Sequence, residues 1–383
     1  MSRKQFIAIL VVLLALGGAA AWVKWSDDTQ WKQTNERVGK PLVSNIKVAD
    51  VAEVRISGTA GVTTLKQVAD GWNVAERSDF PADVERIRDL ILKIIDLRVA
   101  QAEALAPATR ARYGLAEPKA PDTPDAATIV ELRSKDGKAL ARLQLGRVIK
   151  KSVEQQTQQG QTVTREVPSG RFVVGAETDT VVTVNDPLAQ ADADPKSWLI
   201  KEIVRVERPV GMTSTQGGKP RWAFARENDT VLWKFAGSSE ALDQQKAQDI
   251  ANVLYSVNLV DVADPAKVSM GPNDKPIMVK MKTMDGYTYE VQLGEKTDKD
   301  LYPFKFSVAL EEPKPRVAPK GESAEDKAKE DKAYEERVKS IKDKFARENK
   351  LAAWTYLVSK TVAEPILRER AGFAPERKEP AKK

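Results

Sequence analysis

The feature that most constrains the fold of this chain is an internal duplication, because two stretches predict the same elements in the same order. In the first copy these are strands at 51–56 and 62–68, a tryptophan-bearing strand at 71–74, a helix opened by Pro81, and a hairpin of 128–133 and 139–145. In the second copy they are strands at 203–206 and 221–224, a tryptophan-bearing strand at 231–235, a helix from about Ser239, and a hairpin of 277–281 and 287–293. Such a repeated order predicts two equivalent units.

Each predicted hairpin turns at an Asp-Gly pair, Asp136-Gly137 in the first copy and Asp285-Gly286 in the second. Two alternating runs around Asp-Gly are a strong hairpin signal, since glycine adopts the positive φ that a type I′ turn requires. Backbone geometry explains these glycines fully, so we assign them no binding role.

The duplication predicts that residues 51–146 and 203–294 superpose, with Trp72 matching Trp233. The helix of each copy carries apolar residues at three- to four-residue spacing, and such a stripe needs a sheet face to cover it. We therefore predict an α+β fold in which two repeated units of mostly antiparallel sheet with packed helices follow an N-terminal transmembrane helix.

The first α+β repeat is expected to span 42–206 and the second 207–368. Each is predicted to close with a tryptophan-bearing helix, at 194–203 in the first repeat and at 350–362 in the second.

Three further segments depart from the repeated pattern. Residues 150–170 are polar and rich in glutamine, which predicts a long hairpin loop. Residues 311–349 begin with a proline-rich piece and continue with Glu and Lys three to four positions apart, which predicts a charged helical insertion in the second repeat. The last residues, 369–383, have a composition typical of a disordered tail.

The N-terminus contains an uncharged apolar run at 6–23, just long enough to cross a bilayer as a helix. Arg3 and Lys4 precede it, so the positive-inside tendency predicts a membrane anchor at 1–25 with its N-terminus in the cytoplasm. The alternative is a cleaved signal peptide, because the three alanines at 19–21 fit a small-residue cleavage site. Both interpretations place the body outside the cytoplasm.

The composition excludes several kinds of chemistry. The chain has no cysteine, which excludes disulfides, thiolate nucleophiles and iron–sulfur clusters. It has no histidine, which excludes Ser-His-Asp hydrolysis and His-ligated zinc or haem. The net charge of +6 is spread over mixed Lys, Arg, Asp and Glu, without the aromatic-interleaved basic block that would predict nucleic-acid binding.

Known catalytic motifs are equally scarce. Ser44 and Lys47 have the spacing of Ser/Lys acylases, but the partner motifs of those enzymes are missing. Asp192 and Asp194 lack the glycine and distal glutamate of a calcium loop, and no phosphate-binding loop is present. We therefore predict no catalytic, cofactor-binding or metal-binding residues, no cofactor, and no enzyme activity.

The motifs of the first copy resemble a bacterial family catalogued as domain of unknown function 4340. The resemblance covers about residues 42–206 and extends weakly to about 310, and it rests on the order of individually loose motifs. These are the strand at 51–56, Gly71-Trp72, Pro81-Ala82-Asp83, Tyr113-Gly114-Leu115 with Pro118, Leu145-Gly146 and Trp198-Leu199. The second copy departs from the pattern at Met270-Gly271-Pro272.

That resemblance implies no activity and carries over no catalytic residue. It implies a single-pass protein of the bacterial inner membrane, with the bulk of the chain periplasmic or otherwise extracytoplasmic, often encoded beside ABC-type transport components of gliding-type systems. We therefore expect a non-catalytic accessory or interaction subunit with protein partners in a membrane transport complex. The alternative is a carboxylate-dependent hydrolase of cell-wall glycan, for which a buried Asp/Glu pair with aromatic walls would be the evidence.

Overall fold

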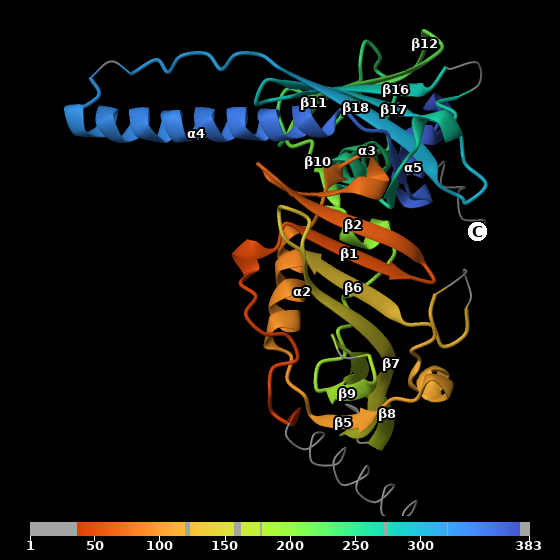
Figure 1. Ribbon diagram of the computed structural model, residues 1–383. Coiled ribbons are helices and arrows are strands. Elements are labelled where there is room, and N and C mark those ends of the chain that lie inside the picture. Colours follow the sequence, from red (N-terminus) through yellow and green to blue (C-terminus); the bar gives the residue numbers. More distant parts are fainter. Residues whose placement is uncertain are drawn as a thin grey trace, which may run out of the picture. The chain divides into compact units, whose positions relative to one another are not determined.

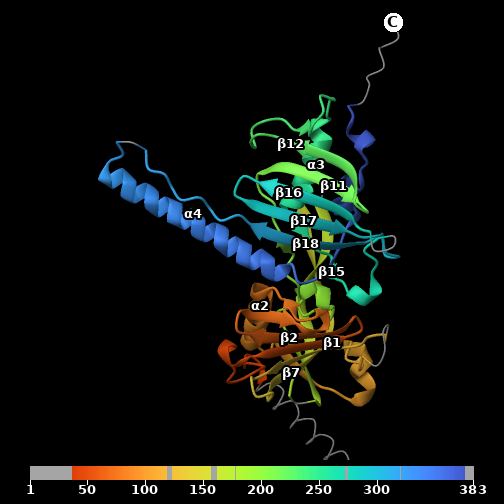
Figure 2. The same ribbon diagram turned by 90° about the horizontal axis from the view of Figure 1, so that it is seen from above.

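The computed structural model describes residues 37–118, 123–156, 162–176, 178–271, 275–319 and 321–375. They form two compact units, one ending at Leu199 and one starting at Ile200, each with one large antiparallel sheet (Figures 1 and 2). The membrane helix predicted at 6–23, within the expected anchor 1–25, lies outside these residues. Within the described ranges, no helix is both long and apolar enough to span a membrane.

The first unit is built on a nine-stranded sheet with the order β4-β3-β2-β1-β6-β7-β8-β9-β5. Its elements are η1 (Val48–Asp50), β1 (Glu53–Gly58), β2 (Gly61–Val68), β3 (Gly71–Val74), η2 (Ala75–Arg77), β4 (Phe80–Pro81), α2 (Val84–Asp96), β5 (Gln101–Ala104), η3 (Pro107–Tyr113), β6 (Thr128–Arg133), β7 (Ala139–Gln156), β8 (Thr162–Val174), β9 (Thr180–Val184) and η4 (Pro195–Trp198). Helix α2 begins where the Asp83 carboxylate accepts a hydrogen bond from the Arg86 N–H, and it buries a stripe of leucine and isoleucine side chains.

The second unit is built on an eight-stranded sheet with the order β13-β12-β11-β16-β17-β18-β19-β15. Its elements are β10 (Glu202–Val204), β11 (Pro209–Gln216), β12 (Lys219–Ala225), β13 (Lys234–Phe235), α3 (Gln244–Tyr255), β14 (Val257–Asn258), β15 (Asp261–Val262), η5 (Pro265–Lys267), β16 (Ile277–Thr283), β17 (Tyr287–Leu293), β18 (Tyr302–Leu310), α4 (Ala324–Leu351), β19 (Tyr356–Val358), α5 (Lys360–Leu367) and η7 (Arg370–Phe373). A separate ladder joins β10 to β14.

The two sheet orders confirm the predicted duplication. From β3 the first sheet continues β3-β2-β1-β6-β7-β8-β9-β5, and from its edge strand β13 the second continues β13-β12-β11-β16-β17-β18-β19-β15. The registers agree as well, because Val74 and Phe235 hold equivalent places opposite the second strand of each copy. Trp72 and Trp233, each two residues earlier, therefore correspond as predicted, although Trp72 lies within β3 and Trp233 lies just before β13. The fold is α+β with mostly antiparallel sheet.

The start of the second copy differs from the prediction. Its first strand is β11, and the assignment of this strand to 203–206 is wrong, because β10 at that place pairs with β14 instead. In β11 only Val210 and Met212 are large apolar side chains, so the alternation that marks a strand is weak. The units divide at Leu199, a few residues before the expected boundary at 206.

Residues 150–156 and 162–170 form a paired ribbon, so the predicted long loop is wrong over these described residues. The ladder between β7 and β8 starts at the pair Gln144–Val174 and continues through this segment to the pair Gln156–Thr162. The valines and threonines of this segment favour extended backbone, and this preference outweighs its glutamine-rich composition.

Of the two predicted tryptophan helices, the one at 194–203 is reduced to a short 3-10 helix, and the one at 350–362 does not form around its tryptophan. Trp198 ends the short 3-10 turn η4, which Pro195 opens and the Asp194 side chain caps. Trp354 lies between the end of α4 and the strand β19, and the closing helix α5 begins only at Lys360. A short capped 3-10 helix thus stands in place of the first predicted helix, and a strand paired between β18 and β15 stands in place of most of the second.

The chain also stays ordered beyond the predicted start of the tail at 369. Arg370–Phe373 is a 3-10 helix, and Phe373 is fully buried. Its ring lies 5.5 Å from that of Trp222 and 4.9 Å from that of Phe224, centroid to centroid. Burial of this ring fixes the segment, and of the predicted tail 369–383 only 376–383 lies outside the described residues.

Candidate functional site

Two segments distinguish the copies from each other. In the first copy, β7 and β8 extend beyond the matched sheet as a ribbon of residues 148–156 and 162–170. In the second copy, an arm separates β18 from β19, and it consists of an extended strap at 311–319 followed by α4. The matched strands are common to both copies and form the scaffold, so these unmatched segments are the candidates for a functional site.

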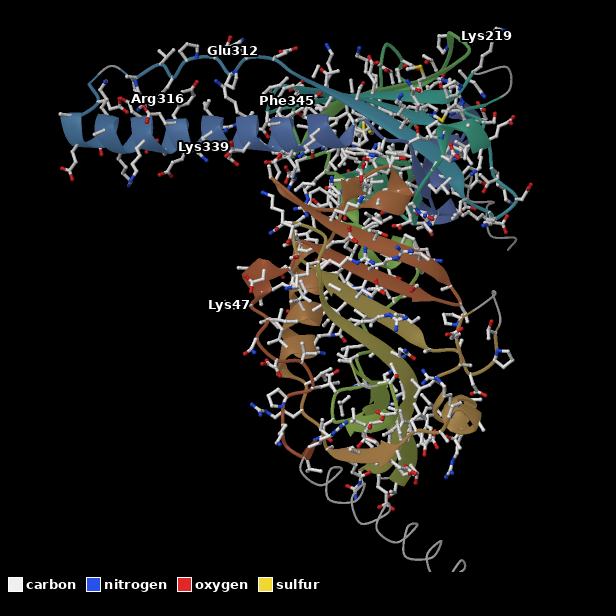
Figure 3. The ribbon with its side chains drawn as sticks, viewed as in Figure 1. Lys47, Lys219, Glu312, Arg316, Lys339 and Phe345 are labelled. Carbon is white, nitrogen blue, oxygen red and sulfur yellow. The ribbon has the colours of Figure 1, made fainter. Side chains whose placement is uncertain are left out.

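The strap runs back along α4 (Figures 1 and 3). The helix has 28 residues, which corresponds to a length of about 42 Å. The Tyr334 hydroxyl donates a hydrogen bond of 2.7 Å to the carbonyl oxygen of Lys314. Arg316 of the strap pairs with Asp331 of α4 at 2.8 Å and with Glu322 at the turn between them. The strap and the helix therefore hold each other.

One stripe of α4 faces the strap and the sheet, and the other positions of the helix are largely exposed. Its members are spaced three and four residues apart, and they are Asp331, Tyr334, Val338, Ile341, Phe345 and Glu348. This spacing keeps the side chains on one face of the helix. Only the last turns of the stripe reach the sheet, where Glu348 and Leu351 are buried.

Glu348 fastens the last turn of α4. Its side chain is fully buried and accepts hydrogen bonds from the Tyr289 hydroxyl at 2.7 Å and from the backbone N–H of Arg205 at 3.0 Å. Burial raises the pKa of the Glu348 carboxyl above its ordinary value, although both hydrogen bonds oppose the rise. The pKa of Tyr289 is also raised, first by burial and then by the neighbouring carboxylate.

A second set of contacts lies one turn earlier on the helix. The Tyr287 hydroxyl donates to the carbonyl oxygen of Ile341 at 2.7 Å, and the Lys344 ammonium pairs with Glu207 at 2.6 Å. The same ammonium lies 5.0 Å from the centroid of the Tyr287 ring. Burial, with smaller contributions from nearby carboxylates, raises the pKa of Tyr287 to about 12. This tyrosine therefore stays a neutral donor.

The Asp-Gly turn of the second copy takes part in holding the arm. Asp285 pairs with Arg337 of α4 at 2.6 Å and with Arg208 at 3.6 Å. Arg208 has a φ of 49°, a backbone conformation that costs a non-glycine residue energy and is kept only where its surroundings fix it. In the first copy the equivalent Asp136 contacts only its own turn, through Ser134.

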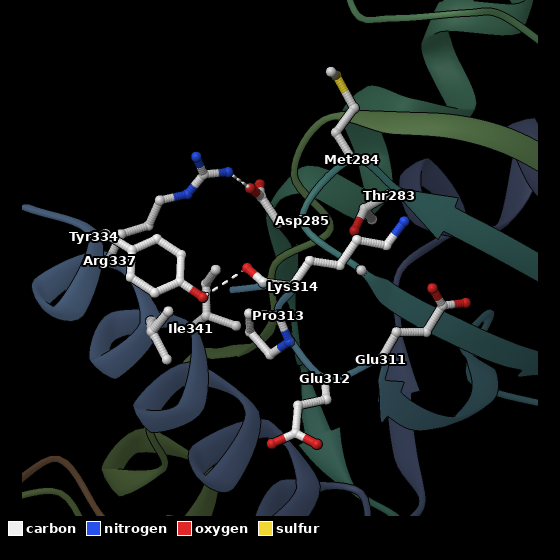
Figure 4. Close-up of a pocket in the computed structure, with 12 residues that line it drawn as sticks. Thr283, Met284, Asp285, Glu311, Glu312, Pro313, Lys314, Tyr334, Arg337 and Ile341 are labelled. Atoms are coloured by element: carbon white, nitrogen blue, oxygen red, sulfur yellow. Dashed lines mark hydrogen bonds and ion pairs between the residues drawn. The ribbon is translucent and has the colours of Figure 1, made fainter. Parts of the chain in front are cut away.

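A groove of about 430 Å³ opens where the strap leaves β18 (Figure 4). It is lined by Thr283, Met284, Asp285, Gly286, Glu311, Glu312, Pro313, Lys314, Tyr334, Arg337, Val338 and Ile341. Apolar side chains of α4 form one wall, and the exposed carboxylates of Glu311 and Glu312 lie on the strap side. Its volume lies within the range of about 300–1,000 Å³ that is usual for ligand pockets.

Three carboxylates line the groove, those of Asp285, Glu311 and Glu312, and none of them is buried. Glu348 is the single buried carboxylate among the described residues, and its hydrogen bonds anchor α4. A glycosidase needs two carboxyl groups facing a bound sugar, about 5–9.5 Å apart. The described ranges also contain no group of three or more Asp and Glu side chains that could hold a metal ion.

The residues weighed from the sequence belong to the first unit, whereas the arm belongs to the second. Ser44 and Lys47 are exposed in the irregular segment before η1, not at a strand edge as expected. Asp192 accepts a hydrogen bond from the Ser197 hydroxyl at 2.6 Å, and Asp194 caps η4. Both aspartates therefore shape a turn.

Sequence reasoning missed Glu348. The signal that could have found it is the regular spacing of Val338, Ile341 and Phe345, which places Glu348 next on the same stripe.

Comparison with known proteins gives one match. No curated protein and no solved structure matches this chain significantly. One family model matches residues 72–276, from β3 of the first copy to the residue before β16 in the second. The matched region covers more than half of the 383 residues. The chain therefore belongs to the family described as a domain of unknown function (DUF4340).

Proposed function

We propose that this chain is a non-catalytic, membrane-anchored envelope protein that serves as an interaction subunit of an ABC-type export or gliding-type transport system. The observation that carries the proposal is the arm, a helix and strap inserted into a duplicated scaffold and fixed to it at one end. The transport context follows from the family resemblance, and the membrane anchor from the apolar run at 6–23.

The arm is suited to binding because its position is fixed before a partner arrives. Hydrogen bonds of Glu348 and Tyr287 hold its last turns, and the pairs of Asp285 and Arg316 hold the rest. A preformed surface loses less conformational entropy on binding than a flexible one. The side of α4 away from the strap is charged, and exposed charges of this kind steer encounters more than they add affinity.

The groove supplies the specific part of such a surface. Val338, Ile341 and Tyr334 offer an apolar wall, and Glu311 and Glu312 add negative charge beside it. We propose that it accepts an apolar side chain of the partner with a basic residue next to it, since buried apolar anchors supply most of the energy of an interface. The predicted anchor would confine this surface beside membrane partners and raise their effective concentration.

The test compares two variants of α4 that add the same charge at neighbouring positions. Val338→Glu places a carboxylate in the groove wall, and Ser340→Glu places one on an exposed position of the same helix. Full-length proteins are purified from detergent-solubilised membranes, and the proteins that travel with them are quantified. We expect Val338→Glu to lose a partner that Ser340→Glu and the wild type retain. Equal recovery of every partner by all three proteins would contradict a role of the groove.

The hydrolase alternative is tested on purified cell-wall sacculi, with each groove carboxylate changed in turn. The variants are Asp285→Asn, Glu311→Gln and Glu312→Gln. A catalytic acid or base contributes about 10²–10⁴-fold, so release of glycan fragments that one of these changes abolishes would replace the interaction proposal.

A further inference from the structure

The ribbon of the first copy has a long open backbone edge. The ladder between β6 and β7 ends at the pair Thr128–Leu145, and no described strand pairs with residues 148–156 on that side of β7. On the other side β8 pairs with them as far as Gln156–Thr162. Unpaired N–H and C=O groups along such an edge are a template for another strand.

The two edges of the ribbon are not equivalent. Pro168 lies in β8 opposite Lys150, and since proline has no N–H it interrupts the row of donors along that strand. The stretch 148–156 of β7 contains no proline and no glycine. A strand added to this ribbon therefore finds its continuous edge on β7.

One face of the ribbon also exposes β-branched side chains. Val153 is 38% exposed and Val163 is 42% exposed. They lie on the same face, because Val153 is opposite Arg165 and Val163 is opposite Gln155. A two-stranded ribbon is marginally stable on its own, and a further strand beside it would cover part of these side chains.

We propose that β7 pairs antiparallel with β7 of a second copy of this chain, about a two-fold axis at Ser152. In this register Lys150 lies opposite Glu154 of the second copy, and by symmetry the same pair forms twice. Lys151 lies opposite Val153 of the second copy, where its aliphatic stem covers the valine. Opposite charges in facing positions of a sheet stabilise the pairing.

Charge selects this register from the others that symmetry allows. When a two-fold axis relates two ribbons that form one continuous sheet, the residue on the axis lies opposite the same residue of the second copy. An axis at Lys150 or Lys151 brings two ammonium groups together, and an axis at Glu154 brings two carboxylates together. An axis at Val153 creates no charge pair. Only the axis at Ser152 gives two opposite-charge pairs.

Lysines at an open edge commonly act against pairing between chains. Lys150 lies 3.3 Å from Glu166 across the ribbon, and both side chains are well exposed. In the proposed register each Lys150 gains a second carboxylate as a partner. The lysines therefore destabilise registers that bring them together and stabilise the register with its axis at Ser152. The pairing is independent of the transport role proposed above.

The test uses the absence of cysteine from the chain, so that one introduced thiol is unique. Ser152→Cys places two thiols opposite each other on the axis, with Cα atoms about 4.5–5.5 Å apart, within the range of a disulfide. Thr164→Cys is the matched control, exposed on β8 of the same ribbon. Its two copies lie three strand spacings apart, about 14 Å, which is too far for a disulfide.

Full-length variants in isolated membranes are treated with a mild oxidant and separated without reductant. We expect a cross-linked dimer from Ser152→Cys at a rate at least about tenfold that of Thr164→Cys. In the Ser152→Cys background, Lys150→Glu should lower the yield about tenfold, and adding Glu154→Lys should restore it.

Three outcomes would overturn the proposal. The first is no dimer from Ser152→Cys. The second is an equal rate from Thr164→Cys, which indicates random collision. The third is a result that indicates another register. This would be either a dimer whose yield Lys150→Glu does not lower, or faster cross-linking of Val153→Cys than of Ser152→Cys.

Discussion

Replacing Glu348 with alanine tests whether the arm is held by its last turns. The carboxylate is fully buried, and it accepts hydrogen bonds from the Tyr289 hydroxyl and the Arg205 N–H. Alanine leaves two buried donors without this acceptor, and each orphaned donor costs about 1–3 kcal/mol. The variant also removes the cost of burying a carboxylate, and the hydroxyl can turn to the Arg205 carbonyl oxygen at 3.5 Å. We therefore expect a net loss of about 2–3 kcal/mol.

Two measurements detect this loss of stability. They are hydrogen exchange across α4, followed by mass spectrometry, and urea unfolding of the full chain. The matched control is Glu335→Ala, which removes an exposed glutamate of the same helix. Glu348→Gln keeps an acceptor without the charge, so exchange in α4 should remain as slow as in the wild type. If Glu348→Ala exchanges no faster than Glu335→Ala, the carboxylate does not hold the arm. If Glu348→Gln is as damaging as alanine, the negative charge is required and the reasoning from hydrogen bonds is wrong.

The same residue makes the stability of the arm depend on pH. Burial raises the pKa of Glu348 in the folded protein above its ordinary value of 4.5, so the folded state binds this proton more tightly than the unfolded state. The resulting stability is fully present below pH 4.5 and is lost as the pH rises through the folded-state pKa. The wild type should therefore lose stability relative to Glu348→Gln as the pH rises through this window.

Three further predictions concern the rest of the chain. A phosphatase fused to the C-terminus should be active and a fluorescent protein fused there dark, because Arg3 and Lys4 keep the N-terminus inside; the reverse result contradicts the predicted topology. Replacing residues 1–24 with a cleavable export signal should weaken partner recovery from membranes without changing thermal stability, since the anchor acts through effective concentration. Gly146→Ala should destabilise the first unit by more than about 2 kcal/mol, since its new Cβ meets the Tyr113 carbonyl oxygen. The control Gly137→Ala places its Cβ in open space and should cost about 1 kcal/mol, because of the positive φ at this position. Equal melting temperatures of the two variants would contradict this prediction.

The strands of the repeated sheets could be predicted from the sequence wherever the local sequence pattern agrees with the strand pairing in the structure. Asp-Gly turns between alternating strands identified both central hairpins, and the stripe of α2 identified its buried face. Prediction failed where a strand had few apolar residues, as in β11, or where polar composition suggested a loop, as in the ribbon. In these places pairing with neighbouring strands decides the conformation, and propensity is only a weak guide.

The candidate site was harder to predict because it depends on contacts between distant residues. The helix around Glu348 has the mixed charge of a solvated helix, and its sequence alone gives little reason to bury a carboxylate there. Tyr289 is 59 residues away in the chain and Arg205 is 143 residues away. Only the fold brings these three groups together.

The last prediction uses the duplication as its own control, because Asp285 and Asp136 occupy the same turn position in the two copies. Asp285 is bonded to Arg337 and Arg208, while Asp136 contacts only Ser134 within its turn. Exposed ion pairs contribute about 0–1 kcal/mol each, so Asp285→Asn should speed exchange in the middle of α4 by a few fold and leave the sheet unchanged. Asp136→Asn should leave both units unchanged. If the two variants behave alike, the turn of the second copy has no special part in holding the arm, and the contacts of Glu348, Tyr287 and Lys344 position α4 without it.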